Sequence, residues 1–72
     1  MLSEYEPPSR ILRIGELKNR VGLARSTIYD RLDQGSPRYD ETFPKPLKIG
    51  MSAVGWMEDE VENWIDVKRM SR

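Results

Sequence analysis

The sequence predicts a small, mainly α-helical domain with one β-hairpin, arranged as a winged helix-turn-helix. Two short helical patterns joined by a glycine-containing turn occupy residues 14–34. Two short apolar stretches around Gly50 then precede an amphipathic helical pattern at residues 57–70. At 72 residues, the chain is long enough for one domain with a small core.

The first nine residues differ from the rest of the chain. Pro7 and Pro8 cannot join a helix or a paired strand, and few apolar residues flank them. We therefore predict a flexible N-terminal tail at residues 1–9 and the winged helix-turn-helix domain at residues 10–72. Residues 10–13 are predicted to form a short strand or an extended lead-in.

Apolar spacing predicts the first helix of the motif. Ile14, Leu17 and Val21 recur at i, i+3 and i+7, which places them on one helix face. Gly22 follows directly, where a helix commonly ends in the left-handed conformation that glycine adopts without steric cost. The chain therefore turns at Gly22 and leads into a second helix.

Ile28 and Leu32 predict that second helix at about residues 25–34, and Gly35 is expected to end it. In a helix-turn-helix, the second helix presents its N-terminal side chains to base edges in the major groove. Arginine can bind a guanine or a phosphate, and hydroxyl groups bond to phosphates or bases. The predicted DNA-binding residues here and beside the hairpin tip are Arg25, Ser26, Thr27, Tyr29, Arg31, Lys45 and Lys48.

Structural roles are the alternatives for these residues. Arg25 is alternatively a solvated first-turn residue, Thr27 a support for the helix start, and Tyr29 a half-buried core aromatic. Arg31 can instead pair with a nearby acid such as Asp33, although an exposed pair is too weak to hold it away from DNA.

Acidic residues weigh against DNA binding, and the charge distribution weighs for it. Asp30 and Asp33 repel phosphate if they face the groove. We interpret Asp30 as lying on a solvent-facing edge; the alternative is that it accepts a hydrogen bond from a cytosine amino group. The net charge is zero, but residues 10–52 contain nine Lys or Arg against five Asp or Glu. Residues 53–72 contain three against five, so the basic excess coincides with the predicted DNA-binding segment.

The composition excludes several classes of protein. The absence of cysteine and histidine removes disulfides, zinc fingers and the commonest general base. We therefore expect that the protein is not an enzyme and that it binds no metal and no cofactor. Trp56 and Trp64 are interpreted as core residues rather than as stacking platforms for single strands. No apolar run could cross a membrane, and the N-terminus lacks a signal-peptide pattern.

Five short segments occur in an order and spacing that are specific when taken together. They are Arg10-Ile11-Leu12-Arg13, Gly22-Leu23-Ala24-Arg25-Ser26-Thr27-Ile28-Tyr29, Phe43-Pro44-Lys45-Pro46, Ala53-Val54-Gly55-Trp56 and Glu60-Val61-Glu62-Asn63-Trp64-Ile65. In these segments the chain resembles the AlpA family of prophage regulatory proteins, over about residues 10–69. That family is similar to excisionases and to the DNA-binding heads of the MerR group. The resemblance implies a bacterial or phage DNA-binding regulator of transcription, often linked to the excision of prophages or genomic islands. With no membrane or signal segment found, we expect a cytoplasmic, nucleoid-associated protein.

The chain departs from the family at two positions. The family often has serine where this chain has Ala24, and losing that helix cap costs roughly 1 kcal/mol. Many members carry an arginine near Ser52, whereas the tip here is uncharged. Lys45 and Lys48 therefore become the better candidates for a contact between the wing and DNA.

Three functions are compatible with these observations. The preferred one is a sequence-specific regulator that binds double-stranded DNA. The second is an excisionase-like architectural factor that works with a recombinase, and the third is an adaptor for other proteins that has lost DNA binding. A lone module of this size buries only about 600–1,000 Å² on DNA. We therefore expect several copies to bind repeated sites cooperatively.

Overall fold

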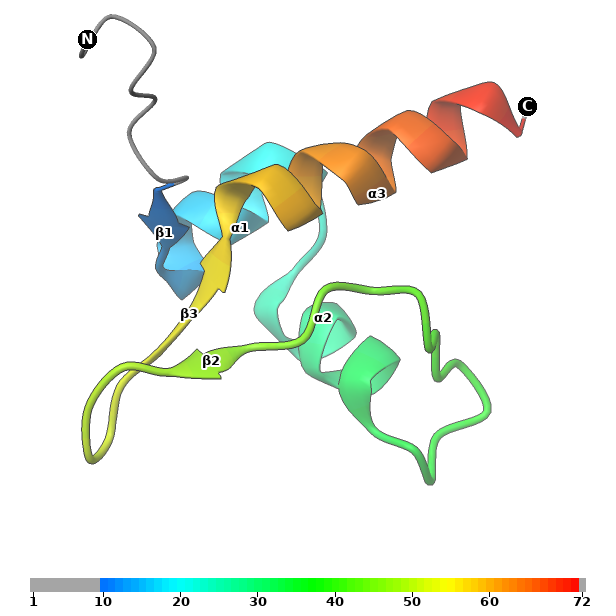
Figure 1. Ribbon diagram of the computed structural model, residues 1–72. Helices are drawn as coiled ribbons and strands as arrows, with labels where there is room; N and C mark the ends of the chain where they lie inside the picture. Colours follow the sequence, from blue (N-terminus) through cyan, green and yellow to red (C-terminus); the bar gives the residue numbers. More distant parts are fainter. Residues whose placement is uncertain (1–9, 72) are drawn as a thin grey trace, which may run out of the picture.

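The computed structural model describes residues 10–71, so the predicted tail at residues 1–9 lies outside the described residues. It has three helices and a small sheet, as predicted for a winged helix-turn-helix (Figure 1). The elements are β1 (Ile11–Leu12), α1 (Ile14–Val21), α2 (Arg25–Leu32), β2 (Leu47–Lys48), β3 (Val54–Met57) and α3 (Glu58–Met70).

The sheet combines the predicted hairpin with β1, which lies within residues 10–13 where a short strand or extended lead-in was predicted. Its order is β1-β3-β2, and both pairings are antiparallel, with Leu12 opposite Trp56 and Leu47 opposite Gly55. A Cβ atom on Gly55 would lie 2.3 Å from Ile11 Cγ2 and 3.1 Å from the Leu12 carbonyl oxygen. Glycine at this position therefore allows β1 to approach β3. The pairing of these two strands connects the start of the helix-turn-helix to the wing.

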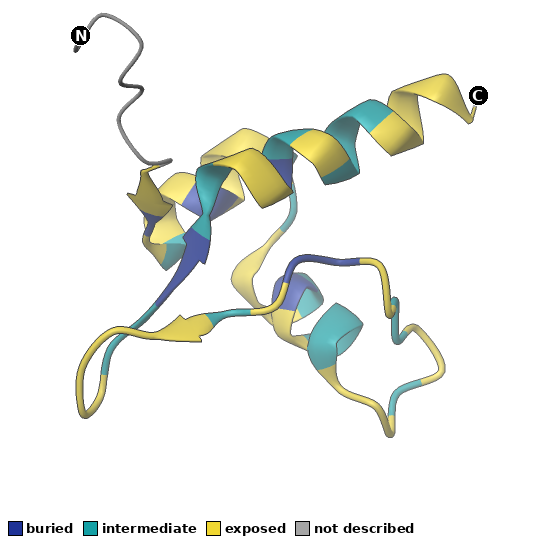
Figure 2. Cartoon of the chain, viewed as in Figure 1, coloured by how far each residue is buried: buried dark blue, intermediate teal, exposed yellow. Residues whose placement is uncertain are grey.

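A single small core connects all three helices to the sheet (Figure 2). One fully buried side chain comes from each helix, one each from β1 and β3, and one from the loop before β2. These six residues are Leu12, Leu17, Ile28, Phe43, Trp56 and Val61. Trp56 is thus a core residue as predicted. Trp64 is half-buried and also packs against this core, edge-on to Phe43, with ring centroids 4.9 Å apart.

The turn between α1 and α2 follows the sequence prediction. Gly22 ends α1 with φ of 72°, and its N–H donates to the Lys18 carbonyl oxygen at 2.8 Å. Ala24 then adopts an extended backbone, and its carbonyl oxygen accepts the first hydrogen bond of α2 from Ile28. No side chain caps the start of α2, as the alanine predicts.

The end of α2 differs from the prediction. The helix ends at Leu32 rather than at residue 34, and Gly35 does not have the positive φ of a helix-ending glycine. Asp33 turns the chain instead. Its Oδ1 accepts the Gly35 N–H at 2.9 Å, and its carbonyl oxygen accepts the Ser36 N–H at 2.9 Å. An aspartate side chain that bonds two residues ahead favours a turn over a continued helix.

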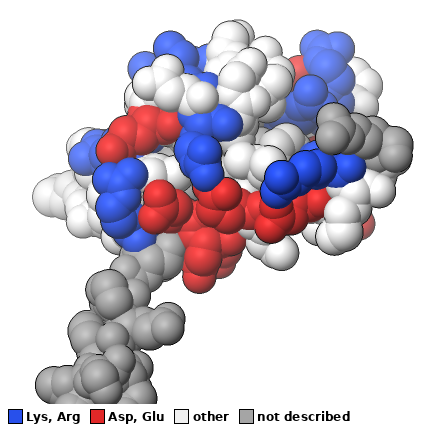
Figure 3. Space-filling model, turned by 90° about the horizontal axis from the view of Figure 1, so that it is seen from above, with Lys and Arg blue, Asp and Glu red and all other residues white. Residues whose placement is uncertain are grey.

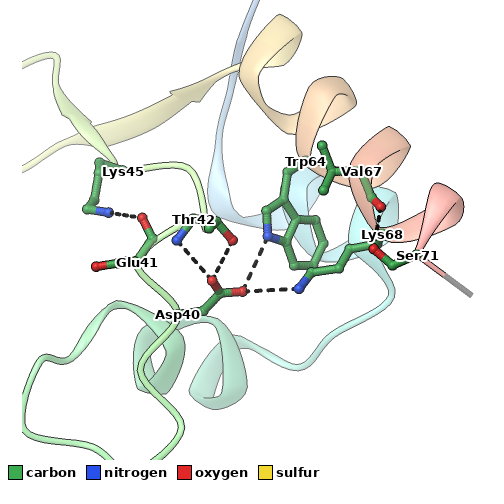
Figure 4. Close-up of polar contacts among 8 residues, drawn as sticks. All are labelled: Asp40, Glu41, Thr42, Lys45, Trp64, Val67, Lys68 and Ser71. Atoms are coloured by element: carbon green, nitrogen blue, oxygen red, sulfur yellow. Dashed lines mark hydrogen bonds and ion pairs between the residues drawn. The ribbon is translucent and has the colours of Figure 1, made fainter.

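Asp40 fixes the loop between α2 and β2 against two helices, and Figure 4 shows its contacts within the loop and with α3. Its N–H donates to the Arg31 carbonyl oxygen at 2.9 Å, and its carboxylate accepts the Thr42 N–H at 2.9 Å and the Thr42 hydroxyl. Trp64 Nε1 and Lys68 Nζ on α3 lie 3.4 and 3.6 Å from Oδ2. Burial raises the pKa of Asp40, but the Thr42 and Trp64 hydrogen bonds and Lys68 outweigh it, so that the pKa is below its ordinary value.

Candidate nucleic-acid interface

The N-terminal half of α2 has one buried side and one exposed, polar side. Ile28 is fully buried in the core. Arg25, Ser26 and Tyr29 are exposed, and Thr27 is half-buried. In Figure 1, α2 lies below α1 and α3 and beside the wing. The core contact of Ile28 therefore orients a row of donor groups toward solvent.

Tyr29 combines a core contact with an exposed part. Its ring packs edge-on against the buried ring of Trp56, with centroids 6.4 Å apart, and the residue is still 39% exposed. The guanidinium carbon of Arg25 lies 5.9 Å from the centroid of the Tyr29 ring. This cation–π contact limits the positions open to Arg25, one turn before Tyr29 on the same helix face.

An open hollow of about 490 Å³ lies beside this half of α2. It brings together three of the predicted DNA-binding side chains, the two acids of the segment and one arginine from the following turn. The lining residues are Ser26, Thr27, Tyr29, Asp30, Asp33 and Arg38.

Both acids beside the hollow are bonded within the protein. Asp30 is partly exposed to solvent there, with its side chain 27% exposed. Its carboxylate accepts the Ser36 hydroxyl at 2.6 Å and Arg38 Nε at 2.5 Å. The hydrogen bond from Ser36, followed by that from Arg38, holds the pKa of Asp30 below its ordinary value. Asp33 accepts the Gly35 N–H at 2.9 Å. The negative charges that weighed against DNA binding are therefore partly compensated by neighbouring donors.

Sequence reasoning did not select Arg38. Its only signal in the sequence is that a basic residue follows the second predicted helix within the next turn. Asp30 and Arg38 are eight residues apart, but α2 ends between them, so neither helix nor strand periodicity relates their side chains. Only the folded turn shows that the two side chains meet.

Arg31 does not lie in this hollow. The residue is half-buried, and its Nε atom is buried without a hydrogen-bond partner among the described residues. No ion pair between Arg31 and Asp33 is found in the described part of the chain. The Arg31 carbonyl oxygen instead receives the Asp40 N–H at 2.9 Å. This carbonyl holds the following loop against α2.

The two lysines of the wing lie in different surroundings. Lys45 precedes β2, and its Nζ donates to the Glu41 carbonyl oxygen at 3.0 Å (Figure 4). It lines a second hollow, of about 390 Å³, between this loop and α3. Lys48 is exposed and pairs with Val54, so it shares a sheet face with Trp56, against which Tyr29 packs. Lys48 is therefore on the α2 side of the wing, and Lys45 is not in the α2 hollow.

Acidic residues gather on another face of the molecule. Figure 3 shows them across the middle of the side along which α3 runs, with Lys and Arg around them. Three acids occupy the first turn of α3, and Glu62 pairs with Arg20 of α1. The acidic excess predicted for the last helix is thus separate from the exposed side of α2.

In residues 10–71, no helix is long and apolar enough to span a bilayer.

These features define a winged helix-turn-helix protein whose second helix has an exposed, polar N-terminal half. Residues 10–70 match the sequence profile of the family described as prophage CP4-57 regulatory protein (AlpA). The chain therefore belongs to the AlpA family, as its motifs indicated.

Two curated relatives differ in length and similarity. The chain is 50% identical over 56 residues to the DNA-binding transcriptional activator AlpA of Escherichia coli strain K12, an alignment that covers 78% of this chain and 80% of that protein. It is 36% identical over 56 residues to the uncharacterized protein ORF88 of Enterobacteria phage P4, covering 78% of this chain and 57% of that protein. No solved structure matches the chain.

Proposed function

We propose that this protein is a sequence-specific regulator of transcription of the phage or prophage type, which binds double-stranded DNA through α2. The observation that carries the proposal is the exposed donor row of α2, whose neighbouring acids are both bonded within the protein. Its E. coli relative is described as a DNA-binding transcriptional activator, which supports the same class of function. The proposed site of action is the bacterial nucleoid.

The residues of α2 have distinct proposed roles. Arg25 reads a base edge, most simply guanine, because its planar fork can form two parallel hydrogen bonds. Ser26 and Thr27 bind phosphate, assisted by the N–H groups of the first turn of α2, which no side chain caps. Tyr29 contacts the backbone or a base through its exposed part, while the Trp56 contact fixes its ring.

Basic residues outside this row have supporting proposed roles. Lys48 reaches the DNA backbone from the wing. Arg31 reaches it from the later turn of α2 only once its half-buried side chain, whose Nε is buried, turns outward. Lys45 is a flanking contact that requires the Nζ–Glu41 hydrogen bond to open. These contacts add affinity without selecting a sequence.

Selection of bound sequences from random duplex DNA, followed by binding titrations, tests the proposal. Arg25→Ala should weaken binding to the selected duplex by about 1–3 kcal/mol and relax the preference at one or two base pairs. Arg69→Ala is the matched control, because it removes the same charge from α3, where Arg69 pairs with Asp66. Equal affinity and equal sequence preference in the Arg25 variant and the wild type would overturn the role of Arg25.

A further inference from the structure

We propose that Arg38 is a DNA phosphate-binding residue of this interface, held in position by Asp30; this inference depends on the proposed function. Arg38 lies in the turn after α2 and lines the same hollow as Ser26, Thr27 and Tyr29. A phosphate bound to the first turn of α2 would lie at this hollow. Arg38 would therefore meet the DNA backbone beside the residues that read the groove.

The guanidinium of Arg38 has donors available for a phosphate. Its side chain is 66% exposed, and its hydrogen bond to Asp30 uses Nε alone. Among residues 10–71, its two terminal nitrogens donate no hydrogen bond. Arginine presents five N–H donors in a rigid fork, so one bond to a carboxylate leaves several for a phosphate. The Asp30 contact and a phosphate contact are thus compatible.

The position of Arg38 is fixed from two sides. The Ser36 hydroxyl donates to Asp30 Oδ1 at 2.6 Å and accepts the Arg38 N–H at 3.0 Å. Asp30 Oδ2 accepts Arg38 Nε at 2.5 Å, and the Asp30 side chain is only 27% exposed. Backbone and side chain of Arg38 are therefore both tied to α2. A preoriented cation loses less conformational freedom on binding than a mobile one.

The competing explanation is that Arg38 only neutralises Asp30. Removing Arg38 alone cannot separate the two roles, because the variant leaves an unpaired carboxylate beside the phosphates. Removing Arg38 in an Asp30→Asn background separates them, because no charge at position 30 then needs neutralising. Under the competing explanation, Asp30→Asn/Arg38→Ala binds DNA like Asp30→Asn.

The experiment measures the affinity of the full chain for its selected duplex at several salt concentrations. Relative to Asp30→Asn, we expect Asp30→Asn/Arg38→Ala to bind about tenfold more weakly. The slope of log affinity against log salt should become shallower by about 0.9, the value for one lost phosphate contact. Sequence preference should be unchanged, because a phosphate contact carries no base information.

Two further variants keep the test conclusive. Asp30→Asn/Arg38→Lys should retain the salt slope of Asp30→Asn, because lysine binds phosphate as a point charge. Asp30→Asn/Arg69→Ala should also retain it, because it removes a charge far from α2. Thermal unfolding of each variant verifies that it is folded at the titration temperature.

The outcomes separate this inference from the proposed function. If the wild type binds its selected duplex and the Arg38→Ala double variant equals Asp30→Asn in affinity and slope, the inference is overturned and the proposed function stands. If the wild type binds no duplex at low salt, the proposed function is overturned, and the inference with it.

Discussion

Serine in place of Ala24 should stabilise the protein, because the structure leaves an empty helix cap there. Ala24 has the extended backbone of an N-cap residue, with φ of −70° and ψ of 157°, and its carbonyl oxygen already accepts the Ile28 N–H at 3.0 Å. A serine hydroxyl at this position can accept the N–H of Ser26 or Thr27. Since Ala24 is exposed, the added hydroxyl does not need to leave water.

The expected gain follows from the energy of one N-cap. Ser or Thr in place of Ala at an N-cap contributes about 1 kcal/mol. For a domain of 60–100 residues, 1 kcal/mol corresponds to a rise in Tm of roughly 4–8 °C. Thermal unfolding followed by circular dichroism, with the urea midpoint as a second measure, determines both quantities.

Ala53→Ser is the matched control for this prediction. It adds the same atom at a half-buried position in the wing, where no helix begins, so no gain in stability is expected. An unchanged or lowered Tm in Ala24→Ser would refute the reasoning. An equal rise in both variants would also refute it, because the gain would then not come from capping.

Two other substitutions test the fold, and one binding measurement tests the expected assembly. Gly55→Ala should destabilise the protein by about 1–3 kcal/mol, because the new methyl group would overlap Ile11. Gly15→Ala is the control and should not destabilise the protein, because nothing lies within 4 Å of the added Cβ. Asp40→Asn should lower the free energy of unfolding at neutral pH by about 1 kcal/mol, measured by urea titration. Because the pKa of Asp40 lies below its ordinary 3.8, its stabilisation is present above pH 3.8 and disappears as pH falls through the lowered pKa. As pH falls through that range, the free energy of unfolding should therefore decrease less for Asp40→Asn than for the wild type. Equal decreases would contradict the stabilising role of the Asp40 carboxylate. Two copies of the protein should bind cooperatively to a DNA probe that carries two binding sites. Strictly independent binding would contradict that expectation.

Local sequence signals predicted the helices well. Leu17 in α1 and Val61 in α3 each belong to an apolar repeat at helical spacing, and the structure buries both. Periodicity was therefore sufficient to locate α1 and α3. Gly22 was sufficient to end α1, because the left-handed conformation at this position favours glycine. At the end of α2 the same rule failed. Asp33 bonds to the backbone ahead of it and turns the chain before Gly35 is reached.

Contacts between distant segments could not be predicted from spacing. The pairing of β1 with β3 depends on the space above Gly55, which exists only once the wing has formed. The bonding of Asp30 by Arg38 depends on the path of the turn after α2, and the anchoring of Asp40 depends on where α3 packs. The sequence therefore predicted candidate residues on α2, whereas the structure showed which neighbouring acids are bonded and that Arg38 lines the same hollow.

Major-groove binding by α2 can be measured directly on the selected duplex. Replacing its purines with 7-deazapurines removes the N7 acceptors from the major groove, and replacing guanine with inosine removes an amino group from the minor groove. We predict that the 7-deaza duplex binds the wild type about tenfold or more weakly and reduces the additional effect of Arg25→Ala, whereas the inosine duplex binds almost normally. Normal binding of the 7-deaza duplex, with loss of binding to the inosine duplex, would contradict the placement of α2 in the major groove.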